Sequence, residues 1–145
     1  MSPKTQVGYL GRGQLARLLS QSAQNLGLTP HVMSKNATDP AAQVTRNWYE
    51  GDPNLVIDLE NFFTKVDIVG FESEFLDSDN LIEAYENSKV EIYPSPKLMA
   101  TLQDRKSQKD LFDQNKLPTS PWAVLDYQDQ VYDFDGIKVL FPYKK

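Results

Sequence analysis

Residues 11–16, Gly-Arg-Gly-Gln-Leu-Ala, have the types and spacing of a ligand-binding turn. They fit the pattern Gly-x-Gly-x-x-Ala, between a predicted strand at 5–10 and a helical pattern at 14–26. Glycines allow a tight turn and a close approach to a ligand, and the free N–H groups at a helix start favour an anion. The candidate binding residues are Gly11, Gly13, Gln14 and Leu15. The alternative is a tight strand-to-helix turn that binds nothing.

A second set of candidate binding residues is acidic. Glu72 and Glu74 follow residues 66–71, a mostly β-branched stretch that predicts a strand. Ligands of open α/β sheets bind beyond the carboxyl ends of the strands. If the strand continues, alternation places both carboxylates on one side, where they can accept hydrogen bonds from an amine or from sugar hydroxyls. A solvated acidic loop is the alternative.

The composition excludes several other kinds of site. The chain has no cysteine and a single histidine, so thiol chemistry and a multi-histidine metal cluster are ruled out. A Ser-His-Asp triad would need His31 as its base. His31 lies inside the apolar run 29–33, which favours a structural role.

Charge and hydropathy restrict the kinds of partner that the chain can bind. The formal charge is −5 and the pI about 4.8, which argues against nucleic acid because phosphate binding needs a basic face. The longest apolar run is far shorter than the roughly 20 residues of a membrane span. The first residues carry no signal-peptide pattern, so we expect a cytoplasmic protein with no membrane partner.

Alternating strand and helix patterns must position these candidate residues. We expect strands at 5–10, 28–34, 48–52, 66–71 and 90–93, with helices at 14–26, 54–63 and 78–88. This order predicts an α/β fold with a doubly wound, mostly parallel, Rossmann-like sheet. The first helix should bury one apolar face, formed by Leu15, Leu18, Leu19, Ala23 and Leu26. Leu81, Ile82 and Tyr85 should face inward from the helix at 78–88.

The character of the sequence changes after Pro96. Residues 96–115 read as one polar helical stretch, followed by a proline-bracketed connection at 116–121. Further strands are expected at 122–125 and 137–145, and the acidic, aromatic stretch 127–135 reads as an exposed hairpin or loop. Because a domain that closes on an apolar strand needs a pairing partner, we expect the sequence to be cut there.

Three segments together resemble the 5-(carboxyamino)imidazole ribonucleotide synthetases of the ATP-grasp superfamily. The turn at 11–16 resembles that family's Gly-x-Gly-Gln-Leu-Gly, and residues 71–74, Phe-Glu-Ser-Glu, resemble its Thr-x-Glu-x-Glu segment. Residues 94–122 resemble its linker helix and its entry into the ATP-grasp domain, through Pro-Ser-Pro, Gln-Asp-Arg, Gln-Lys and Leu-Pro-Thr-Ser-Pro-Trp. The match covers essentially the whole chain.

This resemblance implies an enzyme that joins bicarbonate to the amine of 5-aminoimidazole ribonucleotide with Mg-ATP, through carboxyphosphate, in purine biosynthesis. It implies Gln14 and Leu15 beside the ribonucleotide, Glu72 holding it, and ATP contacts from Arg105, Lys144 and Lys145. It also implies a homodimer. No catalytic residue is expected within this chain, because the magnesium-binding acids would lie beyond residue 145, and the chain alone should not catalyse the reaction.

The resemblance also implies a division of the chain. Residues 1–96 would form a substrate-binding pre-ATP-grasp domain, 97–118 a linker helix and connection, and 119–145 the first strands of an ATP-grasp domain. Two departures from the family pattern stand out. Ala16 replaces a glycine, which close packing tolerates, and Gly70 replaces a threonine, which removes one possible hydroxyl contact.

Three alternatives remain open. An NAD(P)-binding Rossmann domain of an oxidoreductase needs an acid near the end of the second strand, where this chain has Lys35. The formate-dependent glycinamide ribonucleotide transformylase, another ribonucleotide-specific ATP-grasp enzyme, carries Glu in place of Gln14. A ligand-free interaction module could use the same fold. Under the ligand-binding interpretation, Gly11 and Glu72 should share one sheet edge, and an anion should bind near residues 11–15.

Overall fold

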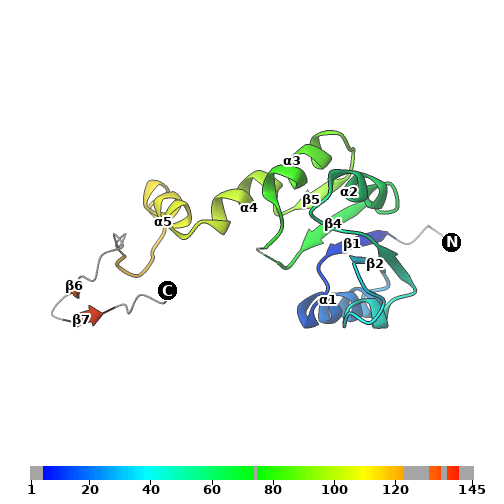
Figure 1. Ribbon diagram of the computed structural model, residues 1–145, viewed down its shortest axis with the longest axis horizontal. Helices are drawn as coiled ribbons and strands as arrows, with labels where there is room; N and C mark the ends of the chain where they lie inside the picture. The colour runs from blue at the N-terminus through cyan, green and yellow to red at the C-terminus, as the bar shows by residue number, and fades with distance from the viewer. Residues whose placement is uncertain (1–4, 74, 123–130, 135–136, 141–145) are drawn as a thin grey trace.

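The computed structural model describes residues 5–73, 75–122, 131–134 and 137–140. Its centre is a parallel sheet in the order β3-β2-β1-β4-β5 (Figure 1). The strands are β1 (Gln6–Leu10), β2 (Thr29–Ser34), β3 (Asn47–Glu50), β4 (Ile68–Phe71) and β5 (Glu91–Tyr93). The parallel α/β fold predicted from the alternating patterns is confirmed.

Helices cover both faces of this sheet. They are α1 (Gln14–Asn25), the short 3-10 helix η1 (Ala42–Val44), α2 (Val56–Phe63) and α3 (Ser78–Glu86). The step from β1 to β2 runs in one direction across the sheet and the step from β4 to β5 in the other. Because crossovers between parallel strands are right-handed, α1 lies on one face and α2 and α3 lie on the opposite face (Figure 1).

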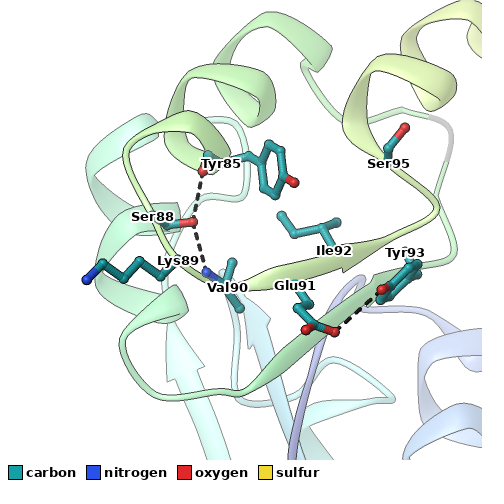
Figure 2. A pocket seen from close by; sticks show the side chains of 8 residues that line it. All are labelled: Tyr85, Ser88, Lys89, Val90, Glu91, Ile92, Tyr93 and Ser95. Atoms are coloured by element: carbon teal, nitrogen blue, oxygen red, sulfur yellow. Dashed lines mark hydrogen bonds between the residues drawn. The ribbon is translucent and has the colours of Figure 1, made fainter.

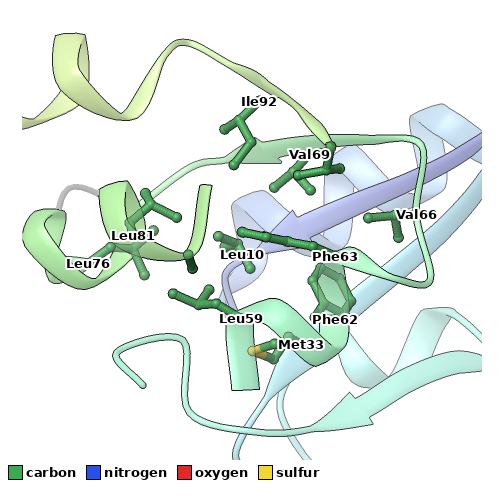
Figure 3. Close-up of a cluster of buried hydrophobic side chains, with 12 residues drawn as sticks. Leu10, Met33, Leu59, Phe62, Phe63, Val66, Val69, Leu76, Leu81 and Ile92 are labelled. Carbon is green, nitrogen blue, oxygen red and sulfur yellow. The ribbon is translucent and has the colours of Figure 1, made fainter. Parts of the chain in front are cut away.

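The face under α2 and α3 holds what we term the large core (Figure 3). Phe62 and Phe63 of α2 lie in this core together with the strand residues Leu10 and Val69. The large core consists of Leu10, Met33, Leu59, Phe62, Phe63, Val66, Val69, Leu76, Leu81, Ala84, Val90 and Ile92. His31 also lies on this face, buried and stacked on Tyr49 with ring centroids 5.7 Å apart. It therefore packs as a core residue.

The face under α1 holds what we term the small core: Ala16, Val32 and Ala41. Here the expected apolar face of the helix is wrong. The residues that α1 buries are Ala16, Ser20 and Ala23, whereas Leu15, Leu18, Leu19 and Leu26 are exposed. Small side chains let the helix lie close to the sheet, and the bulkier leucines are then turned away from it.

The C-terminal end of α1 depends on a glycine. Gly27 has φ +78°, a left-handed conformation that favours glycine at a helix C-terminus. The N–H of Gly27 donates to the Gln24 carbonyl at 3.0 Å, and that of Leu28 to the Ala23 carbonyl at 2.9 Å. These two bonds form a Schellman motif, which satisfies the last carbonyls of the helix.

The inward face of α3 also differs from the prediction. Leu81 is buried as expected, but Tyr85 is 36% exposed and Ala84 is fully buried in its place. Asp77 caps this helix, because its carboxylate accepts from the Asn80 N–H at 3.0 Å. The cap fixes the residue at which the helix begins.

The predicted single helical stretch at 96–115 is two helices, α4 (Pro96–Gln103) and α5 (Arg105–Gln114). Asp104 separates them in an extended conformation, with φ −89° and ψ 121°. Its carboxylate accepts from the Ser107 N–H at 2.7 Å, so Asp104 acts as the N-cap of α5. The sequence feature that indicated this break was Asp104 itself, a good N-capping residue inside an otherwise helical pattern.

The connection after α5 is fastened back onto that helix. Lys109 donates to Thr119 Oγ1 and, at 3.4 Å, to Ser120 Oγ. Trp122 Nε1 donates to Asp113 Oδ2 at 3.0 Å. Lys109 and Asp113 are one helical turn apart, so one face of α5 holds Thr119, Ser120 and Trp122 of the connection.

Two further strands, β6 (Val131–Phe134) and β7 (Ile137–Leu140), pair antiparallel. β6 lies within the acidic stretch that was expected to be a hairpin or loop, and β7 lies within the strand expected at 137–145. Residues 123–130 and 141–145 fall outside the described residues, and with them most of the strand expected at 122–125. Within the part of the chain that is described, no helix is long and apolar enough to cross a bilayer.

Candidate functional site

The candidate site lies at the carboxyl edge of the two central strands. β1 and β4 are parallel neighbours, and Leu10 pairs with Phe71. Gly11 and Glu72 each follow directly after this pair, so both leave the sheet at the same edge. The prediction that the glycine turn and Glu72 share one edge is confirmed.

The side chain of Glu72 reaches across to the glycine turn. A Cβ added to Gly11 would lie 2.4 Å from Glu72 Oε1, and one added to Gly13 would lie 3.9 Å from it. A side chain at position 11 would therefore displace this carboxylate, which is the flexible end of the Glu72 side chain. Glycine at position 11 leaves room for the carboxylate to lie against the turn.

The turn leads into α1 with its backbone N–H groups free of side-chain capping. Gly13 is the N-cap and has no side chain that could accept from them. The first intrahelical bond runs from the Arg17 N–H to the Gly13 carbonyl at 3.1 Å. The N–H groups of Gln14, Leu15 and Ala16 therefore precede any intrahelical bond and are the donors that this end of the helix can offer. The edge thus combines an acceptor, Glu72, with a row of donors.

The loop after β2 lies beside this turn, a neighbour that the sequence reasoning did not identify. The Ala41 N–H donates to the Arg12 carbonyl at 3.2 Å. Lys35 forms an ion pair with Asp52 at 2.5 Å, and this hydrogen bond holds the pKa of Asp52 below its usual value. Lys35 follows β2 and Asp52 follows β3, and these strands pair in parallel, so their ends lie side by side. The strand order would therefore have predicted this contact.

Two apolar side chains stand exposed at the same edge. Leu15 is 59% exposed at the start of α1, and Phe75 is 84% exposed after the acidic segment. Phe75 was not among the predicted site residues. The sequence feature that could have identified Phe75 is a large aromatic residue directly after Glu-Ser-Glu, where a loop is usually polar.

The other predicted site residues lie elsewhere or cannot be placed. Arg105 begins α5, which lies apart from the sheet in Figure 1, and its Nη1 donates to Gln108 Oε1 at 3.0 Å. The structure therefore does not bring Arg105 to the glycine turn. Glu74, Lys144 and Lys145 lie outside the described residues. Among the residues that are described, no cluster of three or more His, Asp or Glu side chains could hold a metal ion.

A pocket of about 450 Å³ lies beside the edge strand β5, away from the glycine turn (Figure 2). Tyr85 and Ile92 point into it from α3 and β5, and Ser88 Oγ donates to the Tyr85 carbonyl at 3.0 Å. Its lining includes none of the predicted site residues. The carboxyl edge therefore remains the candidate site.

Comparison with known proteins identifies a matching family and several relatives. Residues 4–103 match the family described as the ribonucleotide synthetase preATP-grasp domain. An N5-carboxyaminoimidazole ribonucleotide synthase from Synechococcus elongatus is 34% identical over 125 residues, covering 86% of this chain and 31% of that protein. A phosphoribosylaminoimidazole carboxylase from Ogataea methanolica is 27% identical, covering 94% of this chain and 26% of that protein.

Solved structures agree with these relatives. An N5-carboxyaminoimidazole synthase from Aspergillus clavatus, in complex with ADP and 5-aminoimidazole ribonucleotide, superposes with a TM-score of 0.73 at 28% identity. It matches 83% of this chain and 32% of that one. The synthetase from Thermus thermophilus superposes with a TM-score of 0.69 at 28% identity, covering 79% and 31%. The chain thus spans about a third of the length of these proteins.

These relatives are named as N5-carboxyaminoimidazole synthases or synthetases and as a phosphoribosylaminoimidazole carboxylase, which favours the ligase interpretation over the NAD(P)-binding alternative. The family match covers the whole parallel sheet, the glycine turn and Glu72. The chain belongs to the ribonucleotide synthetase pre-ATP-grasp domain family.

Proposed function

We propose that this chain forms the ribonucleotide-binding part of an ATP-dependent ligase that carboxylates 5-aminoimidazole ribonucleotide with bicarbonate in purine biosynthesis. The observation that carries the proposal is the Glu72 carboxylate held against Gly11, in a chain similar to synthases of that class. Because the chain spans about a third of these relatives, the remaining parts of the active site would come from sequence that they have beyond this match.

The acceptor and the donors at the edge would bind different parts of the ligand. A carboxylate accepts hydrogen bonds, so Glu72 suits the amine or the sugar hydroxyls of the ribonucleotide. The N–H groups at the start of α1, at Gln14 and Leu15, are donors and suit an anionic group. Glu72 beside Gly11 would repel an anion there, so we place the anionic group further along the turn, toward Gln14. Glu74 would add a second acceptor.

The nucleotide would bind away from this edge. Arg105 on α5, together with Lys144 and Lys145, would contact ATP, which would supply the phosphoryl group that activates bicarbonate. Magnesium would be held by acids outside this chain. This separation supports the division into 1–96, 97–118 and 119–145, and implies that the chain alone binds ribonucleotide without turning it over. We further propose a cytoplasmic location and a homodimer.

Binding to the purified chain tests the substrate site. Isothermal titration calorimetry with 5-aminoimidazole ribonucleotide should show binding that Glu72→Gln weakens by roughly 10- to 150-fold, because a charge-assisted hydrogen bond contributes about 1.5–3 kcal/mol. Glu91→Gln is the matched control, since Glu91 begins β5 and therefore lies at the amino ends of the strands, away from the glycine turn. Equal affinities for the Glu72 and Glu91 variants would refute the assignment.

Two further titrations distinguish the binding of ATP and of NADH from the binding of the ribonucleotide. Arg105→Ala should weaken ATP binding and leave ribonucleotide binding unchanged, because α5 lies apart from the glycine turn. NADH fluorescence should show no saturable binding. Tight NADH binding that Glu72→Gln abolishes would instead favour an oxidoreductase domain.

A further inference from the structure

Gln103 is the last residue of α4, and its side chain reaches back to the segment that follows Glu72. Its Nε2 donates to the Leu76 carbonyl at 2.7 Å, in a partly buried bond between residues 27 positions apart in the sequence. Asp104 then ends α4 and caps α5, and Arg105, for which we propose an ATP contact, begins α5. The bond therefore ties the candidate site to the point where the chain leaves the parallel sheet (Figure 1).

The segment that carries Glu72 is short and is fixed at both ends. At one end, Phe71 of β4 pairs with Leu10 of β1. At the other end, Leu76 packs in the large core, and its carbonyl accepts the Gln103 hydrogen bond. Only four residues separate Phe71 from Leu76, so the conformations open to Glu72 depend on where Leu76 is held.

The loop after β3 also holds the end of this segment. The Asp77 N–H donates to Asn54 Oδ1 at 2.8 Å. The Asn54 N–H in turn donates to Asp52 Oδ1 at 3.1 Å, and Asp52 forms the ion pair with Lys35. The loops after β2, β3 and β4 are thus joined to one another by side-chain contacts, and the Gln103 bond adds the end of α4 to them.

The helix after this segment has anchors of its own. Its cap is Asp77, whose carboxylate accepts from the Asn80 N–H at 3.0 Å, and Leu81 of α3 is buried in the large core. Removing the Gln103 donor would leave these contacts in place and release only the Leu76 carbonyl. Because loops open locally at a low free energy, the effect should appear in the segment before α3 rather than in the sheet.

We infer that Gln103 is a positioning residue for ribonucleotide binding, which acts through the Leu76 carbonyl on the segment that carries Glu72. Holding a binding loop near one conformation raises affinity, because less conformational freedom is lost when the ligand binds. This role deepens the proposed function and rests on it, since it takes Glu72 to be the residue that holds the ribonucleotide. α4 then takes part in substrate binding, besides joining the sheet to α5.

Two substitutions at one position separate the hydrogen bond from the packing of the side chain. Gln103→Met keeps the length of the side chain but has no donor, whereas Gln103→Lys restores a donor that can reach a carbonyl. The matched control is Gln24→Met, because Gln24 Nε2 also donates to a backbone carbonyl, that of Val44, at 2.9 Å. Gln24 lies near the C-terminal end of α1, away from the glycine turn.

Hydrogen exchange of the purified chain, measured without ligand, tests the positioning directly. In Gln103→Met, the amides of residues 75–77 should exchange about 2- to 10-fold faster than in wild type, the range that one neutral hydrogen bond supports, while the amides of β1 keep their rates. Gln103→Lys and Gln24→Met should leave exchange at 75–77 unchanged. Wild-type exchange at 75–77 in Gln103→Met, or the same acceleration throughout the sheet, would overturn the inference.

Calorimetric titration with 5-aminoimidazole ribonucleotide tests the consequence for binding. Gln103→Met should weaken the affinity by about 2- to 10-fold, because the segment that carries Glu72 must be ordered on binding, and Gln24→Met should bind as wild type does. A wild type that binds no ribonucleotide would refute the proposed function and this role with it. Binding that Glu72→Gln weakens but Gln103→Met leaves unchanged would overturn the role of Gln103 alone.

Discussion

The two faces of the sheet are built on different principles. The face under α2 and α3 holds the large core, in which the rings of Phe62 and Phe63 fill the space between helix and strands. The face under α1 holds only the small core of Ala16, Val32 and Ala41. On the first face stability comes from the burial of large side chains, whereas on the second it comes from close approach of the helix.

Close approach has a consequence for function. Small residues at the helix–sheet contact bring the start of α1 near the ends of β1 and β4, where the glycine turn meets Glu72. The same contact leaves the leucines of α1 outside. The face that contributes less buried apolar surface is therefore the face that supplies the ligand turn and leaves the leucines of α1 exposed.

The largest expected difference between the faces is in the cost of truncating a core residue. Phe62→Ala should lower the free energy of unfolding by about 3–5 kcal/mol, because it removes a fully buried ring and leaves a cavity. Val32→Ala should cost about 2 kcal/mol, since it removes two methyl groups from the small core. Urea unfolding followed by circular dichroism measures both values. Equal losses would show that the asymmetry between the faces is not energetic.

Adding a methyl group probes the same contrast with a smaller effect. A Cβ at Gly8 would lie 2.8 Å from the Phe62 ring and 3.2 Å from Val66, so Gly8→Ala should destabilise the chain by about 1–3 kcal/mol. A Cβ at Gly70, on the α1 face, would lie 3.7 Å from the Tyr9 ring, which is ordinary contact. Gly70→Ala should therefore leave the urea midpoint unchanged or raise it. A Gly70→Ala variant as unstable as Gly8→Ala would mean that the α1 face is packed as tightly as the other.

The smallest expected effect is the pH dependence that the large-core face owes to His31. Burial lowers the pKa of His31, and the nearby charge of Asp67 offsets this only partly. His31 Nε2 is hydrogen-bonded to Gln6 Oε1 at 2.7 Å, and within the described residues its buried Nδ1 has no hydrogen-bond partner. The folded state therefore disfavours the charged form.

Because the folded pKa lies below the unfolded value of about 6.5, this contribution to stability is complete above that value. It is lost as the pH falls toward the folded pKa. Urea midpoints at pH 7.5 and pH 5.5 should differ more for wild type than for His31→Phe, which keeps a ring on Tyr49 but has no titrating group. The same difference in both proteins would assign the pH dependence to other residues.

Much of the architecture could be predicted because local signals agreed with the fold. The strands around Leu10 and Val69 are short apolar runs, and Gly27 ends α1 as its position after a helical pattern suggests. The glycine turn and Glu72 were predicted because each follows a strand, and parallel strands end at one edge. Asp104 was missed as a helix break, since a capping residue within a polar helical pattern resembles an ordinary helical residue.

The sequence by itself determined the order of strands and helices, the glycine turn and its acidic neighbour, because these depend on local propensity and chain direction. Only the tertiary structure decided which side of α1 is buried. A helical pattern shows that Leu15, Leu19 and Leu26 share a side, but the sheet accepts the side with Ala16 and Ala23. The reason is steric: the crossover from β1 to β2 holds the helix close to the sheet, where small side chains fit and leucines do not.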